Sequence, residues 1–300
     1  MSIAVIGNIF VDIKGFPFGK YIADGRNAGE VKYIHGGVGR NVAEDLARLS
    51  LQPVFLSLAD EGSMGDAVVS RLEKSGVDTE WIVRCANGMG TWLAVFNERG
   101  DIAGQISARP DSSPLGALLR KMGDRIFSEP DAVAFEFDMD GEDIAEPIVE
   151  LSKKYNKKLY AVIANMSVAL KRKHLLSSLE CLVCNSEEAG ILFDSDYLSL
   201  TPDVIRTVLK RDAQKLGMRS MVVTLGEQGA VYMDKDGAVG YCPAEKVEVC
   251  DTTGAGDAFF AGVVAGLTKG RTMADAVAFG TRLAASVIVT NENVCPVTEL

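Results

Sequence analysis

The stretch Asp251-Thr252-Thr253-Gly254-Ala255-Gly256-Asp257-Ala258-Phe259-Phe260 is a polar, glycine-rich turn that runs directly into an apolar helical pattern. Gly254 and Gly256, on either side of Ala255, carry no side chain, so the backbone amides of this turn can close around an anion. A helix that begins here directs its positive end and its unpaired amides at the same point. The stretch therefore predicts an anion site at a helix N-terminus.

Asp257 adds a carboxylate beside this predicted anion site, which is an unfavourable place for one unless it has a task. An in-line phosphoryl transfer supplies the task, because the carboxylate can accept the proton of an attacking hydroxyl while the amides stabilise the moving phosphoryl group. The alternative is a capped helix start with a glycine turn. Two acidic residues that bracket T-T-G-A-G are more than a cap requires.

The composition limits the partners and the compartment. The chain has 300 residues, 47% of them hydrophobic, and a net charge of −10 without any long basic block, which disfavours a nucleic-acid partner. No apolar run is long enough to span a bilayer, and the first residues do not resemble a signal peptide, so we expect a cytoplasmic protein. Cys181 and Cys184 form a C-x-x-C within an apolar, strand-like run, which disfavours a metal or redox site.

Strand-like and helix-like segments alternate over most of the chain, which predicts an α/β protein with a mostly parallel sheet covered on both faces. Ligands of such sheets bind beyond the carboxyl ends of the strands. Two segments depart from the alternation. The segment 15–33 has no helical period, and the strand-like runs 91–97 and 102–107 are joined by a predicted hairpin turn. We expect these segments to form a small β appendage.

Polar turns other than 251–257 also carry candidate ligand-binding residues. Asp12 lies in a mostly apolar stretch and indicates either a surface loop or a receptor for ligand hydroxyls. Gly36-Gly37-Val38-Gly39-Arg40-Asn41 opens a helical pattern, and alone it is a weak signal for a small polar ligand. Asn185-Ser186-Glu187-Glu188 fits either a helix cap or a Mg²⁺ site. Thr224-Leu225-Gly226-Glu227-Gln228-Gly229 fits either a hairpin or a phosphate contact, and no Walker motif is present.

Taken together, these four motifs occur in an order and spacing that resembles the ribokinase-like (PfkB) family of carbohydrate and nucleoside kinases, over nearly the whole chain. The resemblance implies a single kinase domain over residues 1–300, folded as a three-layer α/β/α sandwich around a sheet of about nine strands. It also implies a small β lid formed by segments of about 14–35 and 88–107. The implied activity is transfer of the ATP γ-phosphoryl group to a hydroxyl, with Mg²⁺ and possible activation by K⁺.

The resemblance also assigns roles by position. The catalytic base would be Asp257, and the anion hole Gly254, Ala255 and Gly256. The acceptor hydroxyls would be bound by Asp12, Gly37 and Asn41. The nucleotide would be bound by Asn185, Thr224, Gly226 and Gly229, with Mg²⁺ held through water by Glu188. A monovalent cation would be bound by Asp251 and Thr253 and by carbonyls near Ile288, Asn291 and Asn293, although the last segment matches the family only loosely.

The residues that follow the first strand narrow the range of possible acceptor molecules. Asn8 and Asp12, both candidate acceptor contacts, match the G-N-x-x-x-D of adenosine-kinase-like members, whereas sugar kinases usually place an Asn where this chain has Phe10. The segment 27–33 is similar to pseudouridine kinases. We therefore expect transfer to the 5′-hydroxyl of a nucleoside, pseudouridine first, with free ribose or fructose as the alternative. Phosphorylated sugars are disfavoured, because few cationic side chains are available to bind them.

Three further expectations are less specific. Glu136 or Asp138, at the end of a predicted strand, is a candidate acceptor contact. The apolar strand at 91–96 permits a homodimer through the lid. The alternative of another class is a non-catalytic regulator that binds a nucleotide or sugar, although the chain retains the base, the glycine hole and the metal glutamate together.

Overall fold

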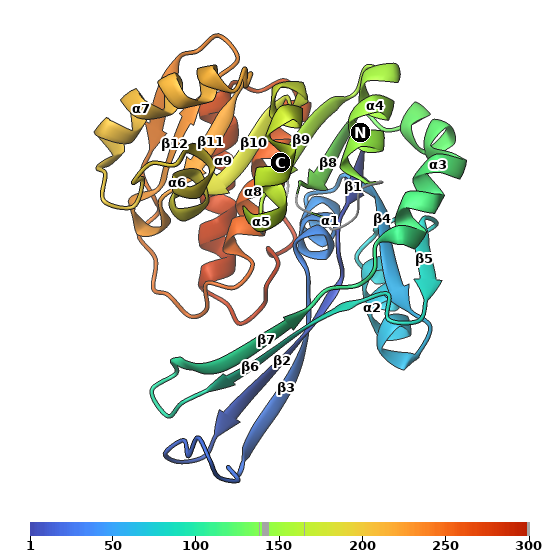
Figure 1. Cartoon of the computed structure of the whole chain (residues 1–300), viewed down its shortest axis with the longest axis vertical. Coiled ribbons are helices and arrows are strands. Elements are labelled where there is room, and N and C mark those ends of the chain that lie inside the picture. The colour runs from blue at the N-terminus through green and yellow to red at the C-terminus, as the bar shows by residue number, and fades with distance from the viewer. Residues whose placement is uncertain (138, 140–143, 165, 299–300) are drawn as a thin grey trace.

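The computed structural model describes residues 1–137, 139, 144–164 and 166–298 of the chain. Within them, the main sheet has nine strands in the order β13-β12-β11-β10-β9-β8-β1-β4-β5 (Figure 1). Pairing is parallel from β11 to β5, and β12 and β13 join in antiparallel fashion. The bounds are β1 Ser2–Ile6, β4 Gln52–Asp60, β5 Ile82–Cys85, β8 Ala132–Glu136, β9 Lys158–Val162, β10 Cys181–Asn185, β11 Met221–Thr224, β12 Ala230–Met233 and β13 Val239–Cys242.

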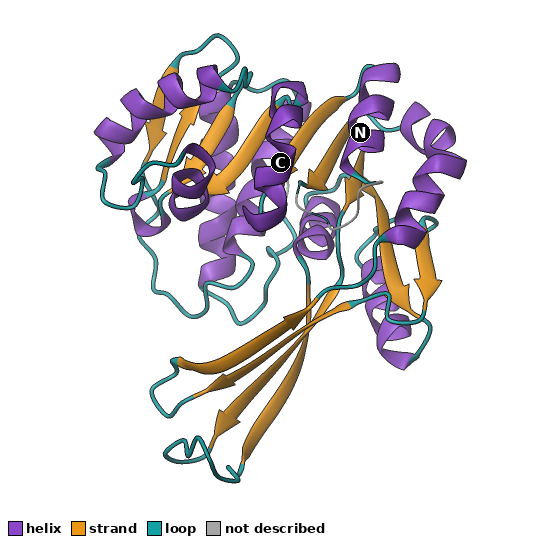
Figure 2. Ribbon diagram, viewed as in Figure 1, coloured by secondary structure: helices purple, strands orange, loops and turns teal. Residues whose placement is uncertain are grey.

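Helices cover both faces of this sheet (Figure 2). One face is covered by α1 Val38–Arg48, α2 Ser63–Lys74, α8 Ala255–Thr268 and α9 Met273–Ile288. The other is covered by α3 Ser113–Ser128, α4 Ala145–Lys154, α5 Met166–Ala169, the 3₁₀ helix Leu170–Ser178, α6 Ser186–Phe193 and α7 Pro202–Lys215. Ile3 and Val5 of β1 enter the first core, whereas Ala4 and Ile6 enter the second. The expected three-layer α/β/α fold is confirmed.

Some elements had no counterpart among the sequence-based expectations. Helix α3, the short helices at 166–178 and the edge strand β13 are additional. The sequence also predicts a helix over 142–155; the structure describes this helix, α4, from Ala145 onward, since 142 and 143 lie outside the described residues, as does Asp138. Cys181 and Cys184 are buried on opposite faces of the sheet, so they cannot share a metal ion. No helix among the described residues is both long and apolar enough to cross a bilayer.

A second sheet projects away from the layered body (Figure 1). Its four strands, in the order β3-β2-β6-β7, are β2 Phe10–Pro17, β3 Gly29–Gly36, β6 Gly90–Phe96 and β7 Ile102–Ala108. We call it the lid sheet. The segment 15–33 was expected to be irregular or an edge strand. Its first residues end β2, its last residues belong to β3, which is an edge strand as expected, and its middle part, 18–28, is irregular.

The two faces of the lid sheet differ in chemistry because neighbouring strands keep their registers. One row of directly paired residues crosses all four strands, and it consists of Tyr33, Ile13, Leu93 and Ile106. The next row along the strands lies on the opposite face, and it consists of Ile34, Asp12, Trp92 and Ser107. We call the face that carries Asp12 the inner face, because the side chain of Lys14, two residues further along β2, reaches Thr253 of the main body.

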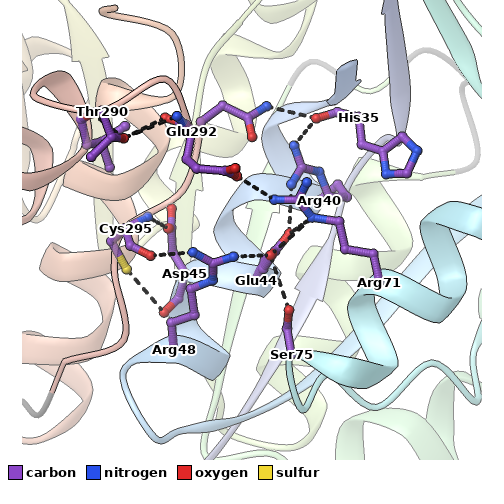
Figure 3. A network of polar contacts seen from close by, with 12 residues as sticks. His35, Arg40, Glu44, Asp45, Arg48, Arg71, Ser75, Thr290, Glu292 and Cys295 are labelled. Carbon is purple, nitrogen blue, oxygen red and sulfur yellow. Dashed lines mark hydrogen bonds and ion pairs between the residues drawn. The ribbon is translucent and has the colours of Figure 1, made fainter. Parts of the chain in front are cut away.

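A buried cluster of charged side chains fastens several segments to α1 (Figure 3). The carboxylate of Glu44, with a fully buried side chain, accepts hydrogen bonds from Arg40 at 2.8 Å, Arg48 at 2.7 Å, Arg71 at 3.0 Å and Ser75 at 3.1 Å. Arg40 is also fully buried. Because an unpaired charge in this position would be strongly destabilising, the carboxylate and its guanidinium partners depend on each other.

The cluster reaches the end of β3 and the segment that follows α9. Arg40 donates hydrogen bonds to the carbonyl oxygens of His35 and Gly36. Arg71 pairs with Glu292 at 3.1 Å, and Arg48 donates to the carbonyl of Cys295 at 2.8 Å. Helix α1 is thereby held to the base of the lid sheet, to α2 and to the segment 290–295.

Asp45 lies next to this cluster and is also fully buried, but no cationic side chain bonds to its carboxyl group among the described residues. Its Oδ1 accepts a hydrogen bond of 2.6 Å from the amide of Cys295, while its Oδ2 has no hydrogen-bond partner among the described residues. Burial raises the pKa of Asp45 to about 8, opposed chiefly by the hydrogen bonds from Cys295. The folded protein therefore holds a proton on Asp45 near neutral pH, whereas the unfolded chain does not.

This proton makes the stability depend on pH. Between the unfolded pKa near 4 and the folded pKa near 8, only the folded state binds the proton, so the contribution of Asp45 to the free energy of unfolding falls as pH rises, by about 1.4 kcal/mol per pH unit. Asp45→Asn mimics the protonated side chain and should remove this slope. Urea unfolding of both proteins from pH 5 to pH 8 measures it; a parallel pH dependence in the two proteins would contradict the assignment.

Candidate active site

The predicted ligand-binding residues lie where the parallel strands end. Asn8 follows β1, and Glu136 closes the adjacent strand β8. Asn185 and Thr224 close β10 and β11, where they are direct register partners. Strand β9 separates the two pairs in the sheet order. The carboxyl edge therefore carries two groups of polar side chains, one on each side of β9, as a ligand site between strand ends requires.

The turn at 251–257 leads into α8, as expected. Gly254 has φ +83°, in the left-handed region, and precedes the first residue of the helix. A Cβ at this position would collide with the carbonyl of Asn293, so glycine is required by both the backbone conformation and the close approach. The first amides of α8 have no acceptor within the helix; that of Ala255 donates to the Thr252 carbonyl at 3.2 Å, and those of residues 256 and 257 can bind an anion.

Asp257 lies in the first turn of α8 and is joined to α1. Its Oδ2 accepts a hydrogen bond of 2.6 Å from Nδ2 of Asn41. Burial raises the pKa of Asp257 to about 6; the Asn41 hydrogen bond and the charge of Arg40 oppose this rise, and the charge of Asp12 adds to it. The Oδ1 of Asn41 is buried without a partner among the described residues, so it can accept a hydrogen bond from a ligand hydroxyl.

Asn8 and Glu136 are bonded to each other. Glu136 accepts hydrogen bonds from the amide of Asn8 at 3.0 Å, from its Nδ2 at 2.8 Å and from the amide of Gly39 at 2.5 Å. A Cβ on Gly39 would collide with Gly7, so the start of α1 packs directly on the end of β1. Glu136 was expected to contact the acceptor; in this arrangement its carboxylate holds the β1 turn against α1.

Asp12 is on the inner face of the lid sheet and only 9% exposed. Burial raises its pKa, and the charges of Lys14 and Arg40 oppose the rise. A Cβ on Gly36 would touch the Asp12 carboxylate, and one on Gly37, whose φ is +97°, would collide with the carbonyl of Asn8. The glycine pair therefore lets β3 pass close to both residues that were predicted to bind the acceptor.

Asn185 and Glu188 form a reciprocal helix cap. The Asn185 side chain accepts from the Glu188 amide at 2.8 Å, and the Glu188 side chain accepts from the Asn185 amide at 2.7 Å. The capping reading of this motif is therefore confirmed, and it leaves open a second role for the carboxylate. The loop after Thr224 is a hairpin between β11 and β12, with positive φ at both Gly226 and Gly229.

The residues predicted to bind a monovalent cation lie close together. Asp251 Oδ1 accepts from the amide and the hydroxyl of Thr253, at 2.8 and 2.7 Å. The carbonyl of Ile288 accepts from the amides of Cys250 and Asp251, which occupies both of its lone pairs. Asn291 contacts Cys250, and Asn293 donates to the carbonyl of His35 at 2.8 Å. The segments 250–254 and 288–293 are thus neighbours, as the loose sequence match implied.

Two charged residues lie beside the turn at 251–257 and the predicted acceptor contacts. The sequence did not assign either of them a role in nucleoside phosphorylation. Lys14 is buried on the inner face of the lid sheet and reaches the turn at 251–257. Arg40 is fully buried in α1 and lowers the pKa of both Asp12 and Asp257. The available sequence signal was that each is a charge within an otherwise apolar or glycine-rich stretch.

Comparison with known proteins agrees with this geometry. Residues 1–298 match the pfkB family of carbohydrate kinases. The chain is 36% identical to the guanosine-inosine kinase of Exiguobacterium acetylicum over 294 residues, which cover 97% of this chain and 96% of that protein. It is 24% identical to the pseudouridine kinase of Escherichia coli strain K12 over 281 residues, which cover 92% of this chain and 87% of that one.

The fold is shared with a solved ribokinase from Giardia lamblia. That structure superposes with a TM-score of 0.83 at 16% sequence identity, covering 97% of this chain and 95% of the other. Kinases of the pfkB family are phosphotransferases that act on hydroxyl acceptors. The chain therefore belongs to the pfkB family of carbohydrate kinases and is a phosphotransferase with a hydroxyl acceptor.

Proposed function

We propose that this protein transfers the γ-phosphoryl group of ATP to the 5′-hydroxyl of a nucleoside. The observation that carries the proposal is the 36% identity to a guanosine-inosine kinase over nearly the full length of both chains. It favours a purine nucleoside such as guanosine or inosine over pseudouridine, which the sequence motifs alone favoured. Pseudouridine remains the second nucleoside candidate, because a pseudouridine kinase matches over most of the chain at lower identity.

The inner face of the lid sheet supports an acceptor that carries a base. Beyond Asp12 it bears Trp92, and Phe16 stacks on Phe96 with ring centroids 4.7 Å apart. Such aromatic faces suit a planar heterocycle, which stacks favourably on them, better than they suit a free pentose alone. Arg40, a conceivable partner for a phosphorylated sugar, is fully buried and paired with Glu44, so it cannot serve at an open acceptor site.

The proposed mechanism uses the residues at the start of α8. Asp257 accepts the proton of the acceptor hydroxyl as its oxygen attacks the γ-phosphorus. Within the predicted anion hole 254–256, the Ala255 amide is bonded to the Thr252 carbonyl, so the amides of Gly254 and Gly256 stabilise the charge that develops on the transferred group. Asn41 keeps Asp257 in place through its 2.6 Å hydrogen bond, and its free Oδ1 can accept from the acceptor. The bridging P–O bond then breaks, and ADP leaves.

ATP, Mg²⁺ and K⁺ are the proposed cofactors. Asn185, Thr224, Gly226 and Gly229 would bind the nucleotide. Glu188 supplies a carboxylate beside this edge, which suits Mg²⁺ because that ion needs few protein carboxylates and keeps most of its waters. When bound, the ion would offset phosphate charge. For K⁺ the fitting donors are Asp251, Thr253, Asn291 and Asn293, whereas the Ile288 carbonyl is already occupied by two amides.

The acceptor is tested directly by incubating the purified protein with Mg-ATP and a panel of guanosine, inosine, adenosine, pseudouridine, ribose and fructose, each in K⁺ and in Na⁺ buffer. We expect ADP release to depend on a nucleoside, with guanosine or inosine giving the highest kcat/KM and K⁺ giving faster turnover than Na⁺. Turnover of free sugars without any nucleoside would overturn the nucleoside assignment. If no compound of the panel stimulated ADP release, the alternative of a non-catalytic binding regulator would be favoured.

The base assignment predicts a pH profile. With the pKa of Asp257 at about 6, kcat/KM should fall as the pH drops below 6, because the protonated carboxyl cannot accept the hydroxyl proton. Asn41→Leu removes a hydrogen bond that lowers this pKa, so the acid limb should move to higher pH. Initial rates of the variant and the parent across the limb give both pKa values; an unmoved limb would argue against Asp257 as the titrating base.

We also propose a homodimer through the outer face of the lid sheet. Ile106 is 68% exposed and Tyr33 64% exposed, and both belong to the apolar row that crosses the four strands. A second copy of the same face matches this surface, since an apolar row is complementary to itself. We expect sedimentation equilibrium to give a dimer that Ile106→Lys dissociates, while Lys32→Glu on the inner face leaves it intact. A monomeric parent protein would refute the proposal.

A further inference from the structure

Lys14 is a buried lysine at the junction of the lid sheet and the start of α8. It lies on the inner face of β2 and is 7% exposed. Its ammonium donates to the hydroxyl oxygen of Thr253, at 3.5 Å. The two residues are 239 positions apart, so this contact joins the lid sheet directly to the glycine-rich turn of the main body.

A buried ammonium group normally has a carboxylate partner, because desolvating an unpaired charge is costly. Among the described residues, no carboxylate forms an ion pair with Lys14. Apart from Thr253, its only other described partner is the ring of Trp92, whose centroid is 5.8 Å from Nζ. The charge of Lys14 acts to lower the pKa of Asp12 and of Asp251. Both carboxylates are therefore within range of its electrostatic field, although neither forms an ion pair with it.

The position of the Lys14 ammonium group suggests why it has no bonded carboxylate. Thr253 is the residue before Gly254, where the amides of α8 begin. Thr253 Oγ1 donates its own proton to Asp251 Oδ1 at 2.7 Å, so it receives Lys14 as an acceptor only. The ammonium therefore lies beside the positive end of α8. The Asp251 carboxylate offsets part of this positive potential, and an anion that binds between Lys14 and the start of α8 would be attracted by both.

We propose that Lys14 binds the oxygens of the transferred phosphoryl group, so that the lid sheet supplies part of the anion site. The inference rests on the proposed transfer at the start of α8. The acceptor oxygen bonds to the γ-phosphorus, the bond to the β,γ-bridging oxygen breaks with its electrons leaving on ADP, and the acceptor proton passes to Asp257. Lys14 takes no part in the proton transfer and offsets the negative charge on the three phosphoryl oxygens.

This placement gives the lid sheet a role in the chemical step as well as in acceptor binding. Asp12 and Lys14 are two residues apart on one strand and therefore point to the same face. The strand that receives the acceptor through Asp12 thus also carries the cation for the phosphoryl group. A lid sheet positioned for the acceptor brings the cation with it, and hydrolysis of ATP without an acceptor is disfavoured.

The alternative is that Lys14 only offsets the charges of Asp12 and Asp251. The two readings differ in what they predict for nucleotides. A γ-phosphoryl ligand discriminates between ATP and ADP, whereas a residue that only balances nearby carboxylates affects both nucleotides alike. Lys32 is the matched control, because it is the register partner of Lys14 on the next strand, faces the same side and is exposed.

The test compares Lys14→Met, Lys14→Arg and Lys32→Met. Calorimetry with Mg²⁺ measures the Kd of ADP and of the non-hydrolysable ATP analogue AMP-PNP, and steady-state rates are measured with the nucleoside that gives turnover. We expect Lys14→Met to lower kcat by roughly 10²–10³-fold and to weaken AMP-PNP about tenfold or more, with the Kd of ADP unchanged. Lys14→Arg should retain more of both, and Lys32→Met should match the parent protein.

Unchanged AMP-PNP affinity in Lys14→Met, or an equal loss of ADP and AMP-PNP affinity, would overturn the proposal. Unaltered ADP binding shows that Lys14→Met has folded. The nucleotide comparison needs no acceptor, so it tests Lys14 even if no nucleoside is phosphorylated. Conversely, Asp257→Asn tests the proposed transfer site separately: if that variant turns over normally, the proposed mechanism fails, whatever Lys14 does to AMP-PNP.

Discussion

The buried carboxylate of Glu44 constrains the rest of this structure. A negative charge without water must be matched in place, and here three guanidinium groups from α1 and α2 and one hydroxyl meet it. The three guanidinium groups have further N–H donors, and these reach the end of β3 and the segment after α9. Helix α1 therefore has little freedom to shift. Since α1 also carries Asn41, the position of the Asp257 side chain follows from a charge cluster that touches no ligand.

The fold was largely predictable because its signals are local. Short apolar strands that alternate with amphipathic helices define a parallel sheet with two covered faces, and β1 shows this directly by feeding adjacent residues into different cores. The edges were harder to predict. Strand β13 is short and lies at the edge of the main sheet, where β12 is its partner among the described strands, so its sequence pattern differs little from that of a loop. The long strands β2 and β3 were obscured because glycine, lysine and proline interrupt their apolar alternation.

The motifs of the site could be predicted from the sequence, whereas the hydrogen bonds between its residues were harder to predict. Glycine-rich turns such as 254–256 reveal themselves because only glycine fits a left-handed backbone against another chain segment. By contrast, the partnership of Glu136 with Asn8 and Gly39 joins residues far apart in the sequence, so no spacing rule reveals it. The same holds for Lys14, whose neighbour Thr253 is on a distant segment. Long-range pairs of this kind depend on tertiary packing, which a single sequence does not encode in any local pattern.

The contact between Gly254 and Asn293 has a consequence for biosynthesis. The carbonyl that closes the rear of the glycine turn belongs to a segment made after all the other parts of the site. During translation, a chain that has reached the end of α9 already contains every motif for nucleotide and acceptor. It still lacks the Asn293 carbonyl, against which Gly254 packs in the folded protein. The anion site is thus complete only once residues 293–295 have been made and are held on α1 by Asp45 and Arg48. A chain that stops at the end of α9 therefore carries all the glycine motifs but lacks the segment against which the turn before α8 packs.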